Sequence, residues 1–384
     1  MRGPQPLRIL QLYPKRDYFT GAAVQLLELA TGLGARGHQV LVATAPSDVW
    51  AGKTRERGLP HCEVPMTSAL DLRSVRALVH LLRAQRIQVV HAHKGRALTL
   101  AFIAALFTPL PVLVANRGVS FKIGRLRARG YATRRVSAVI AVCQAIKQSL
   151  VAAGVPAAKI EVIYSGTDTQ RFHPDVDVTD VRKELGLGAD DLLVTQIGVR
   201  STKGNDDLID AMATVVHRVP QTRLLIVGAR DPRALLQRAR ARGVEHVVRV
   251  VGYREDIPEI LRASRCCVDA SHTGLGLTGA LREALAVETP VVAVDVEGNR
   301  ELVRHGVTGL LVRPRHVAGL ADAILGLVEA PDRAAAMGRA GREVVVARFS
   351  ARTKVERTEA LYFRLLETAE MRRGPAPASL AGGW

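Results

Sequence analysis

Two cations and a carboxylate in the second half of the chain have the types and spacing of a phosphate-binding site. Arg200 and Lys203 lie in the segment 198–204 (GVRSTKG), between an apolar run and a helical pattern. Glu283 lies one turn into another helical pattern, which begins near Gly279. Guanidinium and ammonium groups compensate the charge of a diphosphate, and a carboxylate can accept hydrogen bonds from two ribose hydroxyls. Together the three residues predict a pocket for a nucleoside diphosphate.

Each of these residues also has a simpler interpretation. Arg200 and Lys203 could belong to a solvated loop, and Glu283 could be an acid that the helix dipole favours in a first turn. Their joint position favours the pocket, because both segments follow strand patterns. The carboxyl ends of parallel strands meet at one edge of a sheet, where nucleotides bind.

The glycine spacing G-x-G-x-x-G occurs twice, in different contexts. The copy at 32–37 closes a helical pattern, which is typical of a helix carboxyl terminus. The copy at 274–279 follows an apolar run and precedes a helix, where backbone N–H groups can hold a phosphate. A nicotinamide-binding enzyme would carry the motif after its first strand, and the segment 14–21 lacks it. The sequence therefore disfavours a nicotinamide enzyme.

The net charge of +18 is concentrated in the first half of the chain. Residues 1–174 hold 24 Lys and Arg against 8 Asp and Glu, or +16, and the remaining residues hold 30 against 28, or +2. One stretch has basic residues without acidic ones between them: Lys122, Arg125, Arg127, Arg129, Arg134 and Arg135. This distribution predicts an anionic partner for the first half. Nucleic acid is not expected, because aromatic residues make up only 4% and no stacking platform accompanies the basic stretch.

The composition is that of a globular protein, with 48% apolar and 23% charged residues over 384 positions, enough for two domains. The uncharged stretch 97–115 could be a membrane span, but Pro109 and Pro111 interrupt it and favour a buried helix followed by a buried strand. The beginning of the sequence does not have the pattern of a signal peptide. Its four cysteines lack metal-ligand spacing, which is typical of buried thiols in a reducing compartment. These features predict a cytoplasmic protein.

Short apolar runs alternate with helical periodicity along both halves of the chain. The expected strands of the first half are 7–12, 39–43, 88–91, 111–115, 137–142 and 161–164. Those of the second half are 192–197, 223–227, 247–251, 266–269, 290–294 and 310–312. Continuous apolar strands between helices predict parallel sheets that are covered on both faces. We therefore expect two doubly wound α/β domains, 1–174 and 175–352, joined by a polar linker near 165–180, with a disordered tail at 371–384.

Several segments resemble the GT4 family of glycosyltransferases, and they keep the family's order along the chain. They are AVCQAIKQSLVAAGVPAAKIEVIYSGTDTQRFHP, GVRSTKGNDDLIDAM, RLLIVG, VVGYREDIPEILRAS and EALAVETPVVAVDVEGNRELVRHGVTGLLV. The resemblance spans roughly residues 7–365. It implies a GT-B architecture, in which two Rossmann-like domains face a central cleft. It also implies retaining transfer from a nucleotide sugar with no bound metal or other cofactor, and a last helix, 353–370, that crosses back onto the first domain.

The same resemblance implies roles for individual residues. Arg200 and Lys203 would hold the diphosphate and Glu283 the ribose. The remaining donor contacts would come from Gly21, from Tyr253 and Arg254 beside the base, and from Gly276, Leu277 and Thr278 in the second glycine-rich segment. On the acceptor side we expect His93, Lys122 and Arg125. For His91 and His93, cleft-lining and structural roles both remain open.

Two positions depart from the family's pattern. The family commonly has a glutamate eight positions before Glu283, where this sequence has Leu275. It also often has a histidine at the end of the strand that here finishes with Arg117 and Gly118. Either change could mean an unusual donor, a different arrangement of sugar contacts or weakened catalysis. The side chain of Arg117 could instead add to phosphate binding and catalysis.

The sequence favours an enzyme in which Arg200 and Lys203 stabilise the departing nucleoside diphosphate while an acceptor hydroxyl attacks from the basic first domain. The expected acceptor is an anionic lipid or a cell-envelope glycan precursor, met at the inner face of the cytoplasmic membrane. The alternative from another class is a GT-B-fold nucleotide-sugar-binding protein with lost or altered catalysis. A nucleotide-sugar epimerase on the same fold is a smaller rival, because it needs further acid–base residues.

Overall fold

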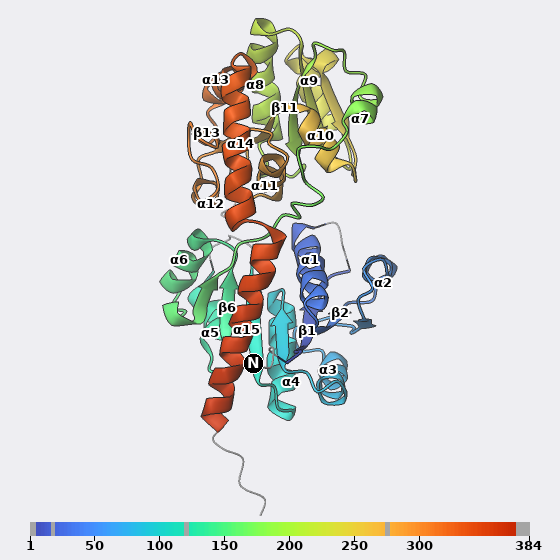
Figure 1. Cartoon of the computed structure of the whole chain (residues 1–384), viewed down its shortest axis with the longest axis vertical. Helices are drawn as coiled ribbons and strands as arrows, with labels where there is room; N and C mark the ends of the chain where they lie inside the picture. Colours follow the sequence, from blue (N-terminus) through green and yellow to red (C-terminus); the bar gives the residue numbers. More distant parts are fainter. Residues whose placement is uncertain (1–4, 17–19, 119–122, 273–276, 374–384) are drawn as a thin grey trace, which may run out of the picture.

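The computed structural model of the protein describes residues 5–16, 20–118, 123–272 and 277–373. These residues form two α/β domains that lie end to end along the longest axis of the molecule (Figure 1). The first domain occupies the lower part of that view and the second domain the upper part.

Seven parallel strands form the sheet of the first domain, in the order β3-β2-β1-β4-β5-β6-β7. The strands are β1 (Arg8–Tyr13), β2 (Gln39–Thr44), β3 (His61–Glu63), β4 (Val89–Ala92), β5 (Val112–Arg117), β6 (Ala138–Ala141) and β7 (Ile160–Val162). The helices between them are α1 (Gly21–Ala35), α2 (Asp48–Arg55), α3 (Leu72–Ala84), α4 (Gly95–Phe107), α5 (Arg125–Ala132) and α6 (Gln144–Ala152). Apolar residues bury the strands on both faces, as expected of a parallel sheet between helices.

Six parallel strands form the sheet of the second domain, in the order β10-β9-β8-β11-β12-β13. The strands are β8 (Leu192–Ile197), β9 (Thr222–Val227), β10 (Val248–Val251), β11 (Ser264–Asp269), β12 (Val291–Val294) and β13 (Gly309–Val312). The helices are α7 (Thr179–Glu184), α8 (Asn205–Arg218), α9 (Arg233–Ala241), α10 (Ile257–Ala263), α11 (Gly279–Ala286), α12 (Glu297–Arg300), α13 (Val317–Val328) and α14 (Pro331–Arg348).

The two sheets share one winding order, so each has one topological switch point. In the first sheet it lies between β1 and β4, and in the second between β8 and β11. Ligands of open α/β sheets bind outside the carboxyl ends of the strands at such a point. The expectation of two doubly wound domains is confirmed. The loops after β8 and β11 flank the switch point of the second sheet, where this rule predicts a ligand site.

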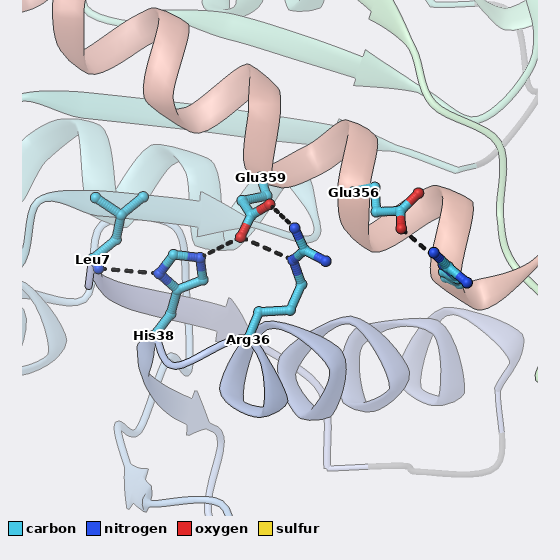
Figure 2. A network of polar contacts seen from close by, with 6 residues as sticks. Leu7, Arg36, His38, Glu356 and Glu359 are labelled. Carbon is cyan, nitrogen blue, oxygen red and sulfur yellow. Dashed lines mark hydrogen bonds and ion pairs between the residues drawn. The ribbon is translucent and has the colours of Figure 1, made fainter. Parts of the chain in front are cut away.

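The last helix, α15 (Ala351–Arg373), returns to the first domain and packs against α1 and β5 (Figure 1). Its Glu359 accepts hydrogen bonds from Arg36 at 2.9 and 2.6 Å and lies 2.8 Å from Nε2 of His38 (Figure 2). His38 in turn accepts from the backbone N–H of Leu7 at 3.1 Å. The end of α1, the start of β1 and α15 are thereby joined through one carboxylate.

Three expectations about local structure have clear outcomes. The uncharged stretch 97–115 forms most of α4 and the beginning of β5, and no helix of the described segments is long and apolar enough to cross a membrane. The glycine string at 32–37 ends α1, and Gly37 has the positive φ of +90° that favours glycine at such an end. The boundary of the tail at 371 is wrong, because α15 continues through Arg373, and 374–384 lie outside the described residues.

The four cysteines, all within the described segments, form no disulfide. Cys143, Cys266 and Cys267 are buried and Cys62 is half-buried. Burial raises the pKa of Cys62 to about 11, so this thiol is not activated as a nucleophile.

Candidate nucleotide-binding site

Lys203 is fixed at the switch point of the second sheet. Its ammonium lies 3.2 Å from Oδ2 of Asp269, the last residue of β11, and its carbonyl accepts from the side-chain amide of Gln196 at 2.7 Å. Gly204 follows with φ +62°, and a Cβ there would lie 2.1 Å from the carbonyl oxygen of Ala270. Only glycine fits a turn with that φ at so close an approach, so the loop after β8 is packed directly against the loop after β11.

A second contact fastens the same two loops. The backbone N–H of His272 donates to the carbonyl of Thr202 at 3.0 Å, and its Nε2 lies 2.7 Å from Oδ2 of Asp207 on α8. Arg200 lies on the exposed rim of the loop, with its carbonyl held by the N–H of Lys203 at 2.9 Å. The loop therefore presents one ammonium against the wall of the site and one guanidinium at its solvent side.

Glu283 faces this loop from the first turns of α11. Burial raises the pKa of its carboxyl group, and the charges of Arg282, Arg171 and Lys203 act in the opposite direction. Thr278 is the N-cap of α11, with an extended backbone and no side-chain hydrogen bond to the helix. Lys203, Glu283 and the positive end of a helix therefore lie around one switch point, an arrangement suited to an anion that carries hydroxyl groups.

The other donor-side residues are spread around these loops. Leu277 is buried and its carbonyl accepts from Arg282 at 3.2 Å, so its backbone borders the site while its side chain belongs to the core. Gly276 and Leu275 lie outside the described residues. Gly21 is the first residue of α1, and a Cβ there would meet no atom within 4 Å, so the space beside it is open.

The two residues expected beside the base follow β10. Tyr253 is exposed. Arg254 is engaged by two carboxylates, Glu184 of α7 and Asp256, which raise the pKa of its guanidinium. The charge of Arg254 is therefore compensated within the protein, and its role would be to shape this edge of the site rather than to bind phosphate.

Three cations, Lys15, Lys94 and Arg117, lie near the switch point of the first sheet. Lys94 precedes α4, and Arg117 ends β5. The pairing of Ala92 with Ala115 between β4 and β5 places Lys94 and Arg117 at neighbouring positions just beyond it. Burial lowers the pKa of Lys94, and the charges of Lys15 and Arg117 lower it further. Like charges gathered in this way are suited to an anionic ligand.

The acceptor-side residues differ in their surroundings. Arg125 is exposed at the start of α5, and Lys122 lies outside the described residues. His93 is buried, with Nε2 2.6 Å from Oε1 of Gln11, and it stacks on His91 with ring centroids 4.1 Å apart. Nδ1 of His91 lies 2.7 Å from the hydroxyl of Tyr362 on α15. Both histidines therefore take part in a buried polar network beneath the last helix.

Several charged residues at this junction were missed by sequence reasoning. Glu28 of α1 lies near Lys354 of α15 and near Arg282 and Glu283 of α11, all close enough for their charges to shift its pKa. Glu28 is separated from Arg282 and Glu283 by about 250 positions and from Lys354 by more than 300, and no spacing pattern connects them. Lys15 and Lys94 could have been found from the sequence, since each follows the end of an expected strand.

The described residues contain no group of three or more His, Cys, Asp and Glu side chains arranged to hold a metal ion. The candidate site is built instead from side-chain cations, a carboxylate and the amino end of a helix.

Two doubly wound parallel α/β domains, with α15 returning from the second domain to the first, form the GT-B architecture of glycosyltransferases. Residues 19–171 match the family model described as Glycosyltransferase Family 4, and residues 192–330 match that described as Glycosyl transferases group 1. The chain belongs to this family of glycosyltransferases.

Two curated relatives illustrate the sequence similarity. The GDP-mannose-dependent alpha-(1-6)-phosphatidylinositol monomannoside mannosyltransferase of Mycobacterium tuberculosis is 35% identical over 210 residues, 50% of this chain and 53% of the relative. The D-inositol 3-phosphate glycosyltransferase of Nocardia farcinica is 32% identical over 266 residues, 66% of this chain and 56% of the relative. The chain thus spans about half the length of the curated relatives it matches.

Solved structures share the fold over nearly the whole chain. Alr3699/HepE of Anabaena in complex with UDP has a TM-score of 0.83 at 24% identity, covering 93% of this chain and all of that one. A glycosyltransferase of Rickettsia africae has a TM-score of 0.87 at 19% identity, covering 95% of this chain and all of that one.

Proposed function

We propose that the protein transfers a sugar, with retention of anomeric configuration, from a nucleoside diphosphate sugar to an anionic lipid or cell-envelope glycan precursor. The observation that carries this proposal is the position of Lys203 on the loop after β8 and of Glu283 in the first turns of α11, the helix that follows the loop after β11. This arrangement supplies a cation and helix N–H groups for a diphosphate, and a carboxylate for the ribose.

In the proposed reaction, the oxygen of an acceptor hydroxyl attacks the anomeric carbon on the face from which the leaving group departs. The bond from that carbon to the diphosphate oxygen breaks, and the diphosphate leaves with the electron pair. The hydroxyl proton passes to a phosphate oxygen of the leaving group. Arg200 and Lys203 stabilise the negative charge that grows on the diphosphate, which lowers the barrier because the charge is larger in the transition state than in the bound donor.

The direct test uses the purified chain with a panel of nucleoside diphosphate sugars and measures release of nucleoside diphosphate. We expect Arg200→Ala and Lys203→Ala each to lower kcat/KM by about 100-fold or more, as loss of a transition-state charge partner does. Arg218→Ala is the matched control, because Arg218 forms an exposed ion pair with Glu329 on the outer helices. Undiminished turnover in both site variants would overturn the proposal. Binding of nucleotides without turnover on any donor would favour the alternative, a GT-B-fold binding protein.

An anionic acceptor is favoured by the cations at the first switch point. Lys15, Lys94 and Arg117 lie on the first domain, which carries the charge excess of the chain. The two curated relatives named above act, by their names, on a phosphatidylinositol mannoside and on an inositol phosphate. We expect Lys94→Met to raise the KM for an anionic acceptor about 10-fold or more and to leave the KM for the donor unchanged. An equal effect on both substrates would argue against an acceptor site here.

Contact with the inner face of the cytoplasmic membrane is part of the same proposal. Leu126 of α5 is 78% exposed and stands between Arg125 and Arg127, so one short helix offers an apolar side chain among cations. Such a surface binds anionic lipid through charge and a shallow apolar insertion. Sedimentation with vesicles that contain phosphatidylglycerol should show salt-dependent binding, which Leu126→Ser weakens. Equal binding to neutral and anionic vesicles, or no binding to either kind, would overturn the proposed membrane contact.

A further inference from the structure

Asp269 is a buried acid that contacts Lys203 and has no assigned role in the proposed reaction. It ends β11 and is 1% exposed. Burial acts to raise the pKa of its carboxyl group, but Lys203 and the hydrogen bonds from Ser271 and Thr278 outweigh burial, and the pKa lies below its ordinary value. A buried carboxylate that is held charged in this way has an energetic cost unless its partners are fixed around it.

The partners of Asp269 come from both loops of the switch point. Lys203 of the loop after β8 lies 3.2 Å from Oδ2. Ser271 donates its backbone N–H to Oδ1 at 3.1 Å, and its hydroxyl donates to the same oxygen. Thr278, the N-cap of α11, lies close enough for its hydroxyl to lower the pKa of the same carboxyl group. One carboxylate therefore binds the phosphate-side lysine and lies beside the residue from which the helix starts.

We propose that Asp269 is a positioning residue, which holds the ammonium of Lys203 and the N-cap of α11 in the arrangement that receives the donor diphosphate. This inference rests on the proposed function and deepens it. A lysine side chain has a long flexible stem, so an unanchored ammonium pays an ordering cost when it binds a phosphate. An ammonium has three N–H donors, so Lys203 can keep its bond to Asp269 and still donate to phosphate oxygens.

A positioning role for Asp269 differs from a merely structural one, because the effect of its substitution must depend on the phosphates of the ligand and on Lys203. Isothermal titration calorimetry of the full chain with uridine and guanosine diphosphates, the matching nucleosides and inorganic pyrophosphate gives that separation. Asp269→Asn should weaken the best-bound nucleoside diphosphate by about 10- to 100-fold, as expected for loss of a charged hydrogen-bond partner, and change nucleoside affinity by less than about 2-fold. Pyrophosphate should lose affinity in parallel.

A double-mutant cycle with Lys203→Met tests the route of the effect. In the Lys203→Met background, Asp269→Asn should cost less than about 3-fold further, because the group that it positions is absent. Asp210→Asn is the matched control: it removes an aspartate that pairs with Arg238 and Arg242 on the outer helices of the same domain, and it should leave all affinities unchanged. If Asp269→Asn does not fold, Ser271→Ala removes one donor and should give a smaller loss of about 2- to 5-fold, again restricted to phosphate-bearing ligands.

The outcomes distinguish this inference from the proposed function. The unsubstituted chain could bind a nucleoside diphosphate while the two substitutions cause independent, additive losses. This result would overturn the role of Asp269 and leave the proposed function standing. Equal losses for the nucleoside and the nucleoside diphosphate would do the same. No binding of any nucleoside diphosphate to the unsubstituted chain would overturn the proposed function and this assignment together.

Discussion

Gln25 and Gly166 exchange two hydrogen bonds across the base of the domain junction. The side-chain amide of Gln25 donates to the carbonyl of Gly166 at 2.7 Å, and its oxygen accepts from the N–H of Gly166 at 2.8 Å. Lys354 of α15 donates to the same side-chain oxygen at 2.9 Å. Helix α1, the linker between the domains and the returning helix therefore meet at one glutamine.

The two crossings between the domains are also bonded to each other. The N–H of Thr167 donates to the carbonyl of Phe349, and the N–H of Ala351 donates to the carbonyl of Thr167, both at 2.8 Å. Arg282 of α11 reaches the hydroxyl of Thr167 at 3.4 Å. Because Arg282 precedes Glu283, the candidate ribose contact lies one residue from a side chain that touches the crossing. The candidate nucleotide site and the crossing between the domains are therefore adjacent in the structure.

Gly166→Ala should weaken this junction sterically. A Cβ at Gly166 would lie 2.6 Å from Cα and 2.8 Å from the nitrogen of Ala351, and backbone cannot move aside as a side chain can. We expect a loss of about 1–3 kcal/mol in the free energy of unfolding, the usual cost of overpacking, measured by urea denaturation. Gly130→Ala is the control, because Gly130 is exposed on α5 with no atom within 4 Å of a new Cβ, and alanine is the better helix former. Equal stability of the two variants would contradict the prediction.

Glu301→Ala should remove a cap that one domain provides for the other. Glu301 of the second domain accepts from the N–H groups of Gln144 at 2.9 Å and Ala145 at 3.1 Å, at the start of α6, where the N-cap residue makes no side-chain cap of its own. It also accepts from the hydroxyl of Tyr164 at 3.0 Å. The expected loss is about 1–2 kcal/mol, as for other lost caps, seen as a lower Tm. Glu301→Gln should keep part of the stability, because the amide oxygen can still accept from these N–H groups. An unchanged Tm in the alanine variant would contradict a stabilising role for the cap.

The strands and the switch-point loops could be predicted from the sequence, because continuous apolar runs in a parallel sheet are a strong local pattern. Lys203 and Glu283 could be predicted to share one site for the same reason, since the loop of Lys203 and the loop and helix of Glu283 each follow a strand. The short strand β3 was missed: its three residues, His61–Glu63, contain one apolar side chain, too few for a period to be visible.

The junction could not be predicted, because its contacts join residues that are far apart in the sequence. Gln25 binds the linker, and Lys354 binds Gln25. Both are ordinary helix residues, and nothing in the sequence around either one indicates these contacts. The surroundings of His91 and His93 could not be predicted either. Their place at a strand end was compatible with a cleft, and only the three-dimensional contacts with Gln11 and Tyr362 reveal the buried network.

Glu28 should make stability depend on pH near neutrality. Burial raises the pKa of its carboxyl group to about 7; Lys354 and Arg282 lower it, whereas Glu283 and Asp168 raise it. The folded chain therefore keeps a proton that the unfolded chain releases near pH 4.5, so the free energy of unfolding falls as the pH rises from about 4.5 to about 7. The fall should be on the order of 3 kcal/mol, at 1.36 kcal/mol per pKa unit.

Glu28→Gln should flatten this fall, because the amide does not titrate. Urea denaturation at several pH values between 4 and 8 measures it, and Glu343→Gln, a change at an exposed position on α14, should keep the slope of the unsubstituted chain. Lys354 adds a separate feature at higher pH. Burial lowers its pKa to about 8, so its contribution makes the protein more stable as the pH rises from about 8 toward 10.5. Parallel curves for the Glu28→Gln variant and the unsubstituted chain below pH 7 would refute the assignment to Glu28.

Glu283→Gln should separate recognition of the ribose from recognition of the diphosphate. The carboxylate lies in the first turns of α11, where burial raises its pKa while Arg282, Arg171 and Lys203 act to keep it charged. A charged acceptor binds a hydroxyl more strongly than an amide oxygen does, so the affinity for a nucleoside diphosphate should fall by about 10-fold. Affinity for inorganic pyrophosphate should stay the same or rise, because a negative charge near the phosphates is removed. Thermal-shift titrations with both ligands measure the two effects, since a ligand that binds only the folded chain raises its Tm by an amount that grows with ligand concentration relative to Kd. Glu245→Gln, at an exposed ion pair with Arg240, is the control. A loss of pyrophosphate affinity equal to the loss for the nucleotide would place Glu283 beside the phosphates instead of the ribose.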